Sequence, residues 1–223
     1  MSDLRLVVFD VDGTLVDSQA HIVAAMSLAF SDLGLDVPER ENILGVVGLS
    51  LPVLMPQLAP QASAATHDAL VEGYKNAFMR LRTINPAADM MPLFPGAKTT
   101  IVDLQSEPET LLGVATGKSR RGLDKVLTSH DLSKTFVTEQ VADHHPSKPH
   151  PSMLQSCLSE TAVDATRAVM VGDTSFDMEM AKAAGFFAVG VSWGYHDRAR
   201  LAAADVIIDQ FEDLQGVLNV HWG

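Results

Sequence analysis

The sequence predicts an α/β fold, in which helices cover both faces of an open parallel sheet and a small all-helical unit is inserted into the chain. Short apolar runs rich in Val and Leu alternate with segments of helical spacing, as expected of parallel strands buried on both faces. Residues 17–93 interrupt this alternation, because they contain long helical patterns and no convincing strand. With 47% hydrophobic and 20% charged residues in a chain of 223, there is enough apolar surface for a substantial core.

The predicted strands and helices alternate along most of the chain. The first strand is the apolar run at residues 4–9, and similar runs follow at residues 111–115, 168–171, 187–191 and 206–208. Segments with helical spacing lie at residues 96–105, 120–129, 150–158 and 176–184. A repeated order of strand, helix, strand predicts parallel strands joined by right-handed crossovers.

Residues 17–93 are predicted to form a helical cap domain. Residues 21–33 and 62–81 carry apolar side chains at helical spacing, among them Ile22, Met26, Phe30, Leu70 and Phe78. Prolines at 52, 56, 60, 86 and 92 mark loops and helix starts within and at the end of this block. We therefore expect a catalytic core formed by residues 1–16 and 94–223, and a cap formed by residues 17–93.

Charge and cysteine content narrow the kinds of partner. Sixteen Lys and Arg residues against 28 Asp and Glu residues give a net charge of −12, which disfavours nucleic acid and anionic membrane surfaces as partners. The one cysteine, Cys157, rules out an internal disulfide and suits a reducing compartment. No run approaches the roughly 20 apolar residues of a membrane span. We expect a cytoplasmic protein, a monomer or homodimer, in which a small anionic substrate would need a local cationic pocket.

Polar residues follow the predicted strands at the edge where ligands bind in open parallel sheets. They are Asp10 and Asp12, then Thr116 and Gly117, then Lys148, and finally Asp173 and Asp177. The carboxylate oxygens suit Mg²⁺, because no histidine or cysteine accompanies them in these loops. Lys148, the Thr116 hydroxyl and a backbone N–H freed by Gly117 would together hold one phosphoryl group.

Asp10 and Asp12 can share the work of a two-step hydrolysis. Asp10 would attack phosphorus, while Asp12 would protonate the leaving oxygen and then activate water. This division requires different environments for the two carboxylates. We expect Asp10, near the metal and the lysine, to stay ionised, and Asp12 to be less stabilised as an anion.

These residues resemble the four motifs of the haloacid dehalogenase-like hydrolase superfamily. "DVDGT" is similar to the first motif, Thr116 to the second, Lys148 to the third and "GDTSFD" to the fourth. The resemblance implies a Rossmann-like core with a helical cap, and Mg²⁺-dependent phosphatase activity through an aspartyl-phosphate intermediate. It implies these roles: Asp10 as nucleophile, Asp12 as general acid and base, Thr116 and Lys148 as phosphate binders, Asp10, Asp12 and Asp173 as metal ligands, and Asp177 beside the metal rather than on it.

Two further stretches, "GVATGKSRRGLDKVL" and "DHHPSKPHPSML", resemble the phosphoglycolate phosphatase-like branch of that superfamily. A sugar-phosphate mutase shares both aspartates and a similar cap, so it stays an alternative. A phosphoaspartate signalling module of receiver type is a second alternative, although it predicts a shorter chain without a cap.

Substrate contacts beyond the phosphate are expected from two places. Lys118, Arg120 and Arg121 form a basic cluster, and one of them is expected to face the non-phosphate end of the substrate, with a solvated helix start as the rival interpretation. Residues 45–50, "GVVGLS", are a candidate loop over the site, because glycines such as Gly48 permit close approach, and an ordinary turn between helices is the alternative.

Overall fold

A computed structural model describes residues 4–84 and 91–223, which contain one six-stranded parallel sheet with the order β3-β2-β1-β4-β5-β6. The strands are β1 (Arg5–Phe9), β2 (Thr110–Thr116), β3 (Thr138–Val141), β4 (Ala168–Gly172), β5 (Phe187–Val191) and β6 (Val206–Ile208). In the register of the central strands, Val8 of β1 pairs with Gly113 of β2 and Met170 of β4. The predicted parallel sheet is confirmed.

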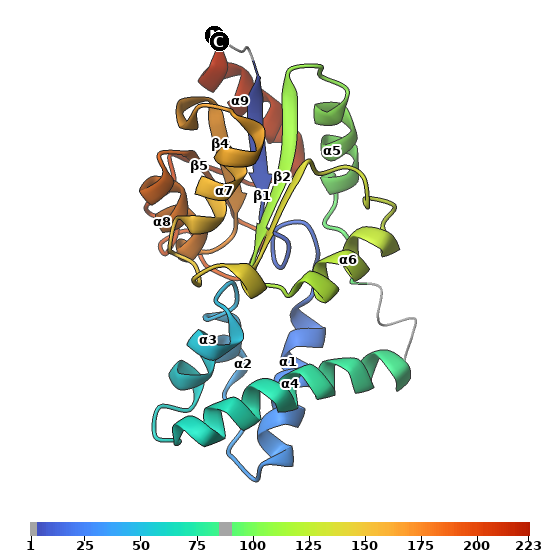
Figure 1. Ribbon diagram of the computed structural model, residues 1–223, viewed down its shortest axis with the longest axis vertical. Helices are drawn as coiled ribbons and strands as arrows, with labels where there is room; N and C mark the ends of the chain where they lie inside the picture. Colours follow the sequence, from blue (N-terminus) through green and yellow to red (C-terminus); the bar gives the residue numbers. More distant parts are fainter. Residues whose placement is uncertain (1–3, 85–90) are drawn as a thin grey trace.

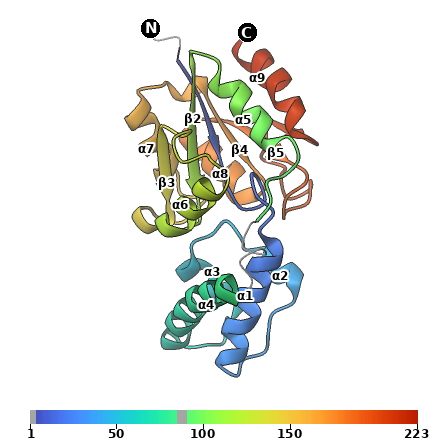
Figure 2. The same ribbon diagram turned by 90° about the vertical axis from the view of Figure 1, so that its right-hand side faces the viewer.

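Helices cover both faces of the sheet, as the three-layer prediction requires (Figure 2). One face packs against α5 (Ala97–Gln105), α6 (Arg120–Ser129) and α9 (Leu214–Trp222), and the other against α7 (Ser152–Thr161) and α8 (Ser175–Ala184). Side chains of β1 alternate between these layers: Val7 and Phe9 join the first core, and Leu6 and Val8 the second. All four are fully buried, which explains why the strand reads as a continuous apolar run.

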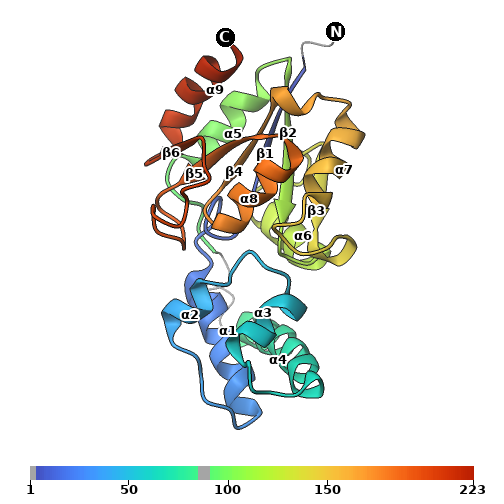
Figure 3. The same cartoon turned by 90° about the vertical axis from the view of Figure 1, so that its left-hand side faces the viewer.

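A helical unit lies beyond the carboxyl ends of the strands (Figures 1 and 3). It consists of α1 (Gln19–Asp32), α2 (Arg40–Leu44), α3 (Leu51–Leu58) and α4 (Ala64–Ile84). These helices have a hydrophobic core of their own, to which Met26, Phe30, Ile43, Met55 and Leu70 contribute. The helical content agrees with a cap. The domain limits at residues 17 and 93 stay a prediction. Residues 85–90 of that block, with Pro86, lie outside the described residues.

The structure adds elements that the sequence pattern did not indicate. Strand β3 has four residues, of which Thr138, Glu139 and Gln140 are polar, so it lacks the apolar run by which the other strands were found. Helices α2, α3 and α9 were also not predicted. Helix α3 carries Pro52 in its first turn, where a missing N–H costs little. Across residues 4–84 and 91–223, none of the helices combines the length and apolar character needed to span a bilayer.

Candidate active site

Three carboxylates and a lysine meet at the carboxyl edge of the sheet. Asp10 follows β1, Asp173 follows β4, and Asp177 lies in the first turn of α8, and one oxygen from each lies within 4.8 Å of the others. We call these three residues the acidic cluster. Lys148, from the loop before α7, places Nζ 2.9 Å from Oδ1 of Asp10 and 2.6 Å from Oδ1 of Asp177. All four side chains are buried.

Burial dominates the electrostatics of this cluster. Burial raises the pKa of Asp10 to about 7, although the ammonium of Lys148 opposes the rise. Burial, with the charges of Asp10 and Asp177, raises the pKa of Asp173 well above its ordinary value. Burial acts to lower the pKa of Lys148, but Asp10 and Asp177 outweigh it and raise the pKa, so this side chain is an ammonium.

The donor set fits a divalent cation. With every carboxylate ionised, the acidic cluster carries three negative charges against the one positive charge of Lys148, and buried charges require compensation. In addition, Oδ2 of Asp10 is buried and has no hydrogen-bond partner among the described residues. Hard carboxylate oxygens without a nearby thiolate or imidazole ligand suit Mg²⁺.

Asp177 is already occupied by protein groups. Its Oδ1 accepts from Lys148, while its Oδ2 accepts from the backbone N–H of Thr174 at 3.1 Å and from the Thr174 hydroxyl at 2.7 Å. The Thr174 side chain in turn accepts from the Asp177 N–H, so the pair forms a capping box at the start of α8. Asp177 therefore anchors both the helix and the lysine.

Asp173 is held by two donors from distant segments. Thr14 donates to Oδ1 at 3.0 Å, and the backbone N–H of Tyr195 donates to Oδ2 at 2.8 Å. Gly13 lies against this carboxylate, since a Cβ at Gly13 would be 2.2 Å from Oδ2, and its φ of +82° also favours glycine. The Gly-Thr pair that follows Asp12 thus serves Asp173 as well as the turn.

Asp12 has a cation of its own. Lys118 places Nζ 2.7 Å from Oδ1 of Asp12, because the loop after β2 lies beside the end of β1. A cation beside this carboxylate was not anticipated from the sequence. Ser18 donates to the same oxygen, and the Tyr195 hydroxyl lies 2.8 Å from Ser18 Oγ and accepts from the Ser18 N–H.

Thr116 and Gly117 lie where β2 meets the cap. The backbone N–H of Lys118 donates to Thr116 Oγ1 at 3.2 Å, which leaves the hydroxyl hydrogen able to donate to a ligand. A Cβ at Gly117 would lie 2.6 Å from the carbonyl oxygen of Gly48. The glycine that was expected to let an anion approach therefore also lets the cap approach.

Residues 45–50, which we call the cap loop, are bound to the core. The backbone N–H of Ser50 donates to Ser147 Oγ at 2.9 Å. His196 accepts from the Ser175 N–H at Nδ1, so its Nε2 carries the proton and donates to the carbonyl of Gly45 at 3.1 Å. Burial lowers the pKa of His196, which favours this neutral form. The cap loop thus lies beside Gly117 and directly over the candidate site.

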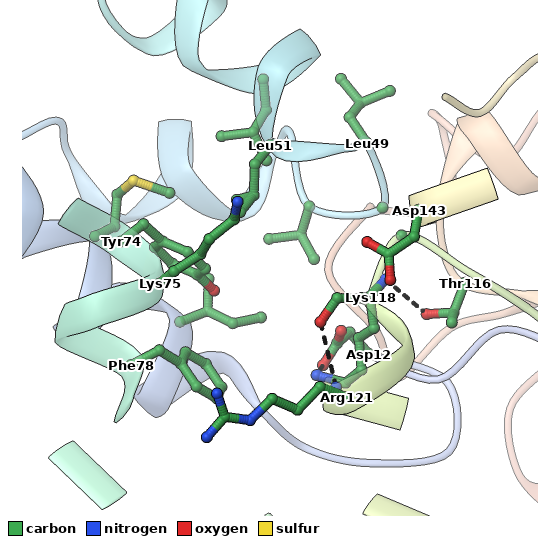
Figure 4. Close-up of a pocket in the computed structure, with 18 of the residues that line it drawn as sticks. Asp12, Leu49, Leu51, Tyr74, Lys75, Phe78, Thr116, Lys118, Arg121 and Asp143 are labelled. Atoms are coloured by element: carbon green, nitrogen blue, oxygen red, sulfur yellow. Dashed lines mark hydrogen bonds and ion pairs between the residues drawn. The ribbon is translucent and has the colours of Figure 1, made fainter. Parts of the chain in front are cut away.

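A cavity of about 390 Å³ separates the core from the cap helices. Asp10, Asp12, Thr116 and Gly117 line its core side, and all four cap helices contribute apolar side chains. Figure 4 shows Asp12, Thr116 and Lys118 on one side of the cavity, with Tyr74 and Phe78 of α4 on the other. The site therefore combines a polar floor with a predominantly apolar cover, to which Glu72, Lys75 and Asn76 of α4 add polar groups.

The structure brings every predicted site residue to this region and adds others. Asp10, Lys148, Asp173 and Asp177 form one buried group, while Asp12, Thr116, Gly117, Lys118 and Gly48 line the cavity. Sequence reasoning missed Thr14, Ser18, Ser147, Tyr195 and His196. The segment after β5, "SWGYH", could have been found, because it follows a predicted strand at the same edge of the sheet.

Of the basic cluster, Arg120 faces away from the cavity and Arg121 lines it. The guanidinium of Arg120 bonds to Glu139 and to its backbone carbonyl. Arg121 is an exposed cavity-lining residue with no ion pair among the residues that the structure describes.

The sequence and the fold are similar to those of known proteins. The haloacid dehalogenase-like hydrolase family matches residues 7–191. A probable phosphatase IndB from Dickeya dadantii is 37% identical over 219 residues, covering 96% of this chain and 93% of that protein. A phosphoglycolate phosphatase from Aliivibrio fischeri is 29% identical over 223 residues, covering 98% of each. A solved haloacid dehalogenase-like family hydrolase from Streptococcus pneumoniae has the same fold, with a TM-score of 0.82 at 23% identity, covering 97% of this chain and 99% of that one.

A parallel sheet that gathers carboxylates and a lysine under a helical cover defines an α/β enzyme with a buried acidic cluster that could hold a metal ion. The chain belongs to the haloacid dehalogenase-like hydrolase family. The predicted Rossmann-like fold is confirmed. The prediction of a phosphoric monoester hydrolase similar to phosphoglycolate phosphatases is confirmed at the level of similarity, since relatives carry both descriptions. Family membership removes the receiver-type alternative.

Proposed function

We propose that this enzyme is a Mg²⁺-dependent phosphatase that hydrolyses a small-metabolite phosphomonoester through an aspartyl-phosphate on Asp10. The observation that supports this most directly is the pairing of two differently placed carboxylates at one strand end. Asp10 lies in the acidic cluster beside Lys148, and Asp12 faces the cap cavity. A phosphoryl group held between them would meet a nucleophile on one side and a proton donor on the other.

In the first proposed step, an oxygen of Asp10 attacks phosphorus. The bond between phosphorus and the ester oxygen breaks, and Asp12 gives that oxygen its proton, so the alcohol leaves. The Thr116 hydroxyl and the backbone N–H of Gly117 donate to the phosphoryl oxygens. Lys148 adds positive charge beside the nucleophile at 2.9 Å.

In the second proposed step, Asp12 takes a proton from a water molecule that attacks phosphorus of the aspartyl-phosphate. The bond between phosphorus and Asp10 breaks, which frees inorganic phosphate and restores the Asp10 carboxylate and the protonated Asp12. Lys118 and Ser18 hold Asp12 in one orientation for both proton transfers. The cap loop over Gly117 would exclude bulk water from the first step.

Mg²⁺ would be held by Asp10, by Asp173 and by the backbone carbonyl of Asp12, with Asp177 beside it. The buried negative charge and the unpaired Oδ2 of Asp10 support this assignment. Thr174 and Lys148 already engage both oxygens of Asp177, which supports a position beside the metal and not as a direct ligand. When bound, Mg²⁺ supplies positive charge that holds a phosphoryl oxygen and favours the ionised form of Asp10.

The relatives suggest a substrate for this proposal. Phosphoglycolate is one candidate, because several relatives at 27–30% identity are described as phosphoglycolate phosphatases. A sugar-phosphate mutase would transfer the phosphoryl group to a second hydroxyl, and it differs by releasing no phosphate. A cytoplasmic location, a monomer or homodimer, and independence of nucleic acid and membranes stay predictions from composition.

Phosphate release from a panel of small phosphate esters tests the proposal. We expect hydrolysis with Mg²⁺, loss of at least about a thousandfold in kcat for Asp10→Asn, and loss with a chelator. Asp103→Asn is the matched control, because this exposed aspartate lies on α5, away from the cavity. In Asp12→Asn, we expect phosphorylated Asp10 to accumulate when the ester has a leaving group that departs without protonation. Mass spectrometry of the acid-quenched protein should detect this intermediate.

Hydrolysis that persists in Asp10→Asn and in chelator would exclude this mechanism. Conversion of a sugar phosphate to its isomer without phosphate release would favour the mutase.

A further inference from the structure

We propose that the preferred substrate has a hydrophobic, ring-sized leaving group that carries an anionic substituent, rather than the two-carbon acid of phosphoglycolate. This inference rests on the proposed function, because it concerns the group attached to the phosphate. It follows from the composition of the cavity above Asp12 and from the position of Arg121.

The cavity places the leaving group against the cap. Asp12 is the proposed proton donor to the ester oxygen, and it lies on the cavity floor with Thr116. A phosphoryl group at Asp10 therefore directs its alcohol away from the sheet and into the space under α1, α3 and α4. Whatever fills that space is in contact with cap side chains.

Those cap side chains are predominantly apolar. Met26 of α1, Ile43 of α2, Leu54 of α3 and Phe78 of α4 line the cavity, and the first three are buried. Tyr74 and Phe78 add two rings whose centroids are 5.7 Å apart. Contact between this surface and apolar carbon of the substrate would make the binding free energy more favourable. A small charged acid would leave the same surface exposed to water and gain nothing from it.

The size of the cavity points in the same direction. Its 390 Å³ is the liquid volume of about thirteen water molecules. Glycolate would leave most of the apolar wall in contact with water, whereas a ring-sized group would cover it. A larger hydrophobic leaving group is therefore the better complement.

Arg121 supplies the second half of the inference. This exposed residue lines the cavity from the start of α6 and has no ion pair among the described residues. Figure 4 shows its side chain extending toward Phe78. The neighbouring cations are engaged, Lys118 with Asp12 and Lys75 with Glu72. Arg121 is thus the lining cation available to a carboxylate or second phosphate on the leaving group.

Three alkyl phosphates separate the features: 4-carboxybenzyl phosphate, benzyl phosphate and 2-phosphoglycolate. All release primary alcohols, which limits the contribution of leaving-group acidity to the comparison. We expect kcat/KM for the carboxybenzyl ester to exceed that for 2-phosphoglycolate by about tenfold or more. Arg121→Gln should lower kcat/KM about tenfold for the carboxybenzyl ester and less than about twofold for the benzyl ester, with Arg121→Lys between.

Arg198→Gln is the matched control, because it removes the same charge from an exposed arginine that pairs with Asp209 on the core surface. It should leave kcat/KM unchanged for both benzyl esters. Equal or better hydrolysis of 2-phosphoglycolate, or an equal effect of Arg121→Gln on both benzyl esters, would overturn the inference and leave the phosphatase proposal standing. If none of the three esters, nor any of the wider panel, released phosphate, the proposed function itself would fail.

Discussion

Replacing Lys148 with methionine removes the ammonium from the acidic cluster and keeps a flexible side chain of similar length in its place. In the native chain this ammonium lies 2.9 Å from Asp10 and 2.6 Å from Asp177, and its side chain is fully buried. The variant leaves three buried carboxylates without it. We expect the free energy of unfolding to fall by about 3–5 kcal/mol at pH 8, the cost of breaking a buried ion pair from one side.

The cost should depend on pH, with a sign that the structure determines. Burial raises the pKa of Asp10 from 3.8 to about 7, so the folded chain keeps a proton that the unfolded chain has lost. Stability from such a group is present at low pH and falls as pH rises from about 4 to the folded pKa. Lys148 lowers this pKa, so its removal moves the end of that fall above pH 7. The difference in unfolding free energy between the native chain and Lys148→Met should therefore grow by about 1.4 kcal/mol from pH 6 to pH 8.

Urea denaturation followed by circular dichroism, in chelator at pH 6 and pH 8, measures both quantities. The same substitution in an Asp10→Asn background completes a double-mutant cycle. We expect the cost of Lys148→Met to be clearly smaller there, because one of the two partners of the ammonium is already neutral. Equal costs in both backgrounds, or a cost that is the same at both pH values, would refute the ion-pair reasoning.

Three other predictions concern the metal, the turn and the cap. Because the pKa of Asp10 is about 7, Mg²⁺ competes with a proton at that carboxylate, and its affinity should be about tenfold weaker at pH 6 than at pH 8 by calorimetry. Gly13→Ala would place a methyl group 2.2 Å from Asp173 at a φ of +82°, so it should cost more than about 2 kcal/mol of unfolding free energy by urea denaturation and weaken Mg²⁺ binding. Gly117→Ala would place a methyl group 2.6 Å from the cap loop, so kcat/KM should fall by about tenfold or more in the phosphate-release assay.

Both glycine predictions have a control in the same chain. Gly34→Ala has a similar φ of +68° but no heavy atom within 4 Å, so it should cost only about 1–2 kcal/mol and leave Mg²⁺ binding unchanged. Gly216→Ala lies in open space on α9 and should leave kcat/KM unchanged. The contact of Gly13 with Asp173 is contradicted if Gly13→Ala lowers the unfolding free energy no more than Gly34→Ala. The contact of Gly117 with the cap loop is contradicted if Gly117→Ala keeps full activity. Competition between Mg²⁺ and a proton at Asp10 is contradicted if the Mg²⁺ affinity is the same at pH 6 and pH 8.

Much of the fold could be predicted because its elements carry local signals. Strands β1, β2, β4 and β5 are buried on both faces, so each is a short apolar run that can be recognised without its neighbours. Strand β3 has only four residues, three of them polar, so its identity as a strand depends on pairing with β2. Its local sequence contains no comparable signal.

The candidate site divides in the same way. Asp10, Asp12, Thr116, Lys148 and Asp173 could be nominated because each ends or follows a strand, or lies just before a helix, at the edge where parallel sheets bind ligands. The contacts among them could not be predicted in detail. One residue of the basic cluster was expected to face substrate. Lys118 does line the cavity, and its ammonium also pairs with Asp12, because the two strand ends are neighbours in the sheet.

By itself, the sequence determined the alternation of strands and helices, the helical character of the cap and the residue types at the strand ends, since hydrophobic period and strand order are local properties. Only the tertiary structure decided which groups touch. Ser18 meets Tyr195 across 177 positions, and the cap loop meets Gly117 across the boundary between cap and core. Such contacts follow from how the layers pack, because side chains brought together by packing need share no pattern along the chain.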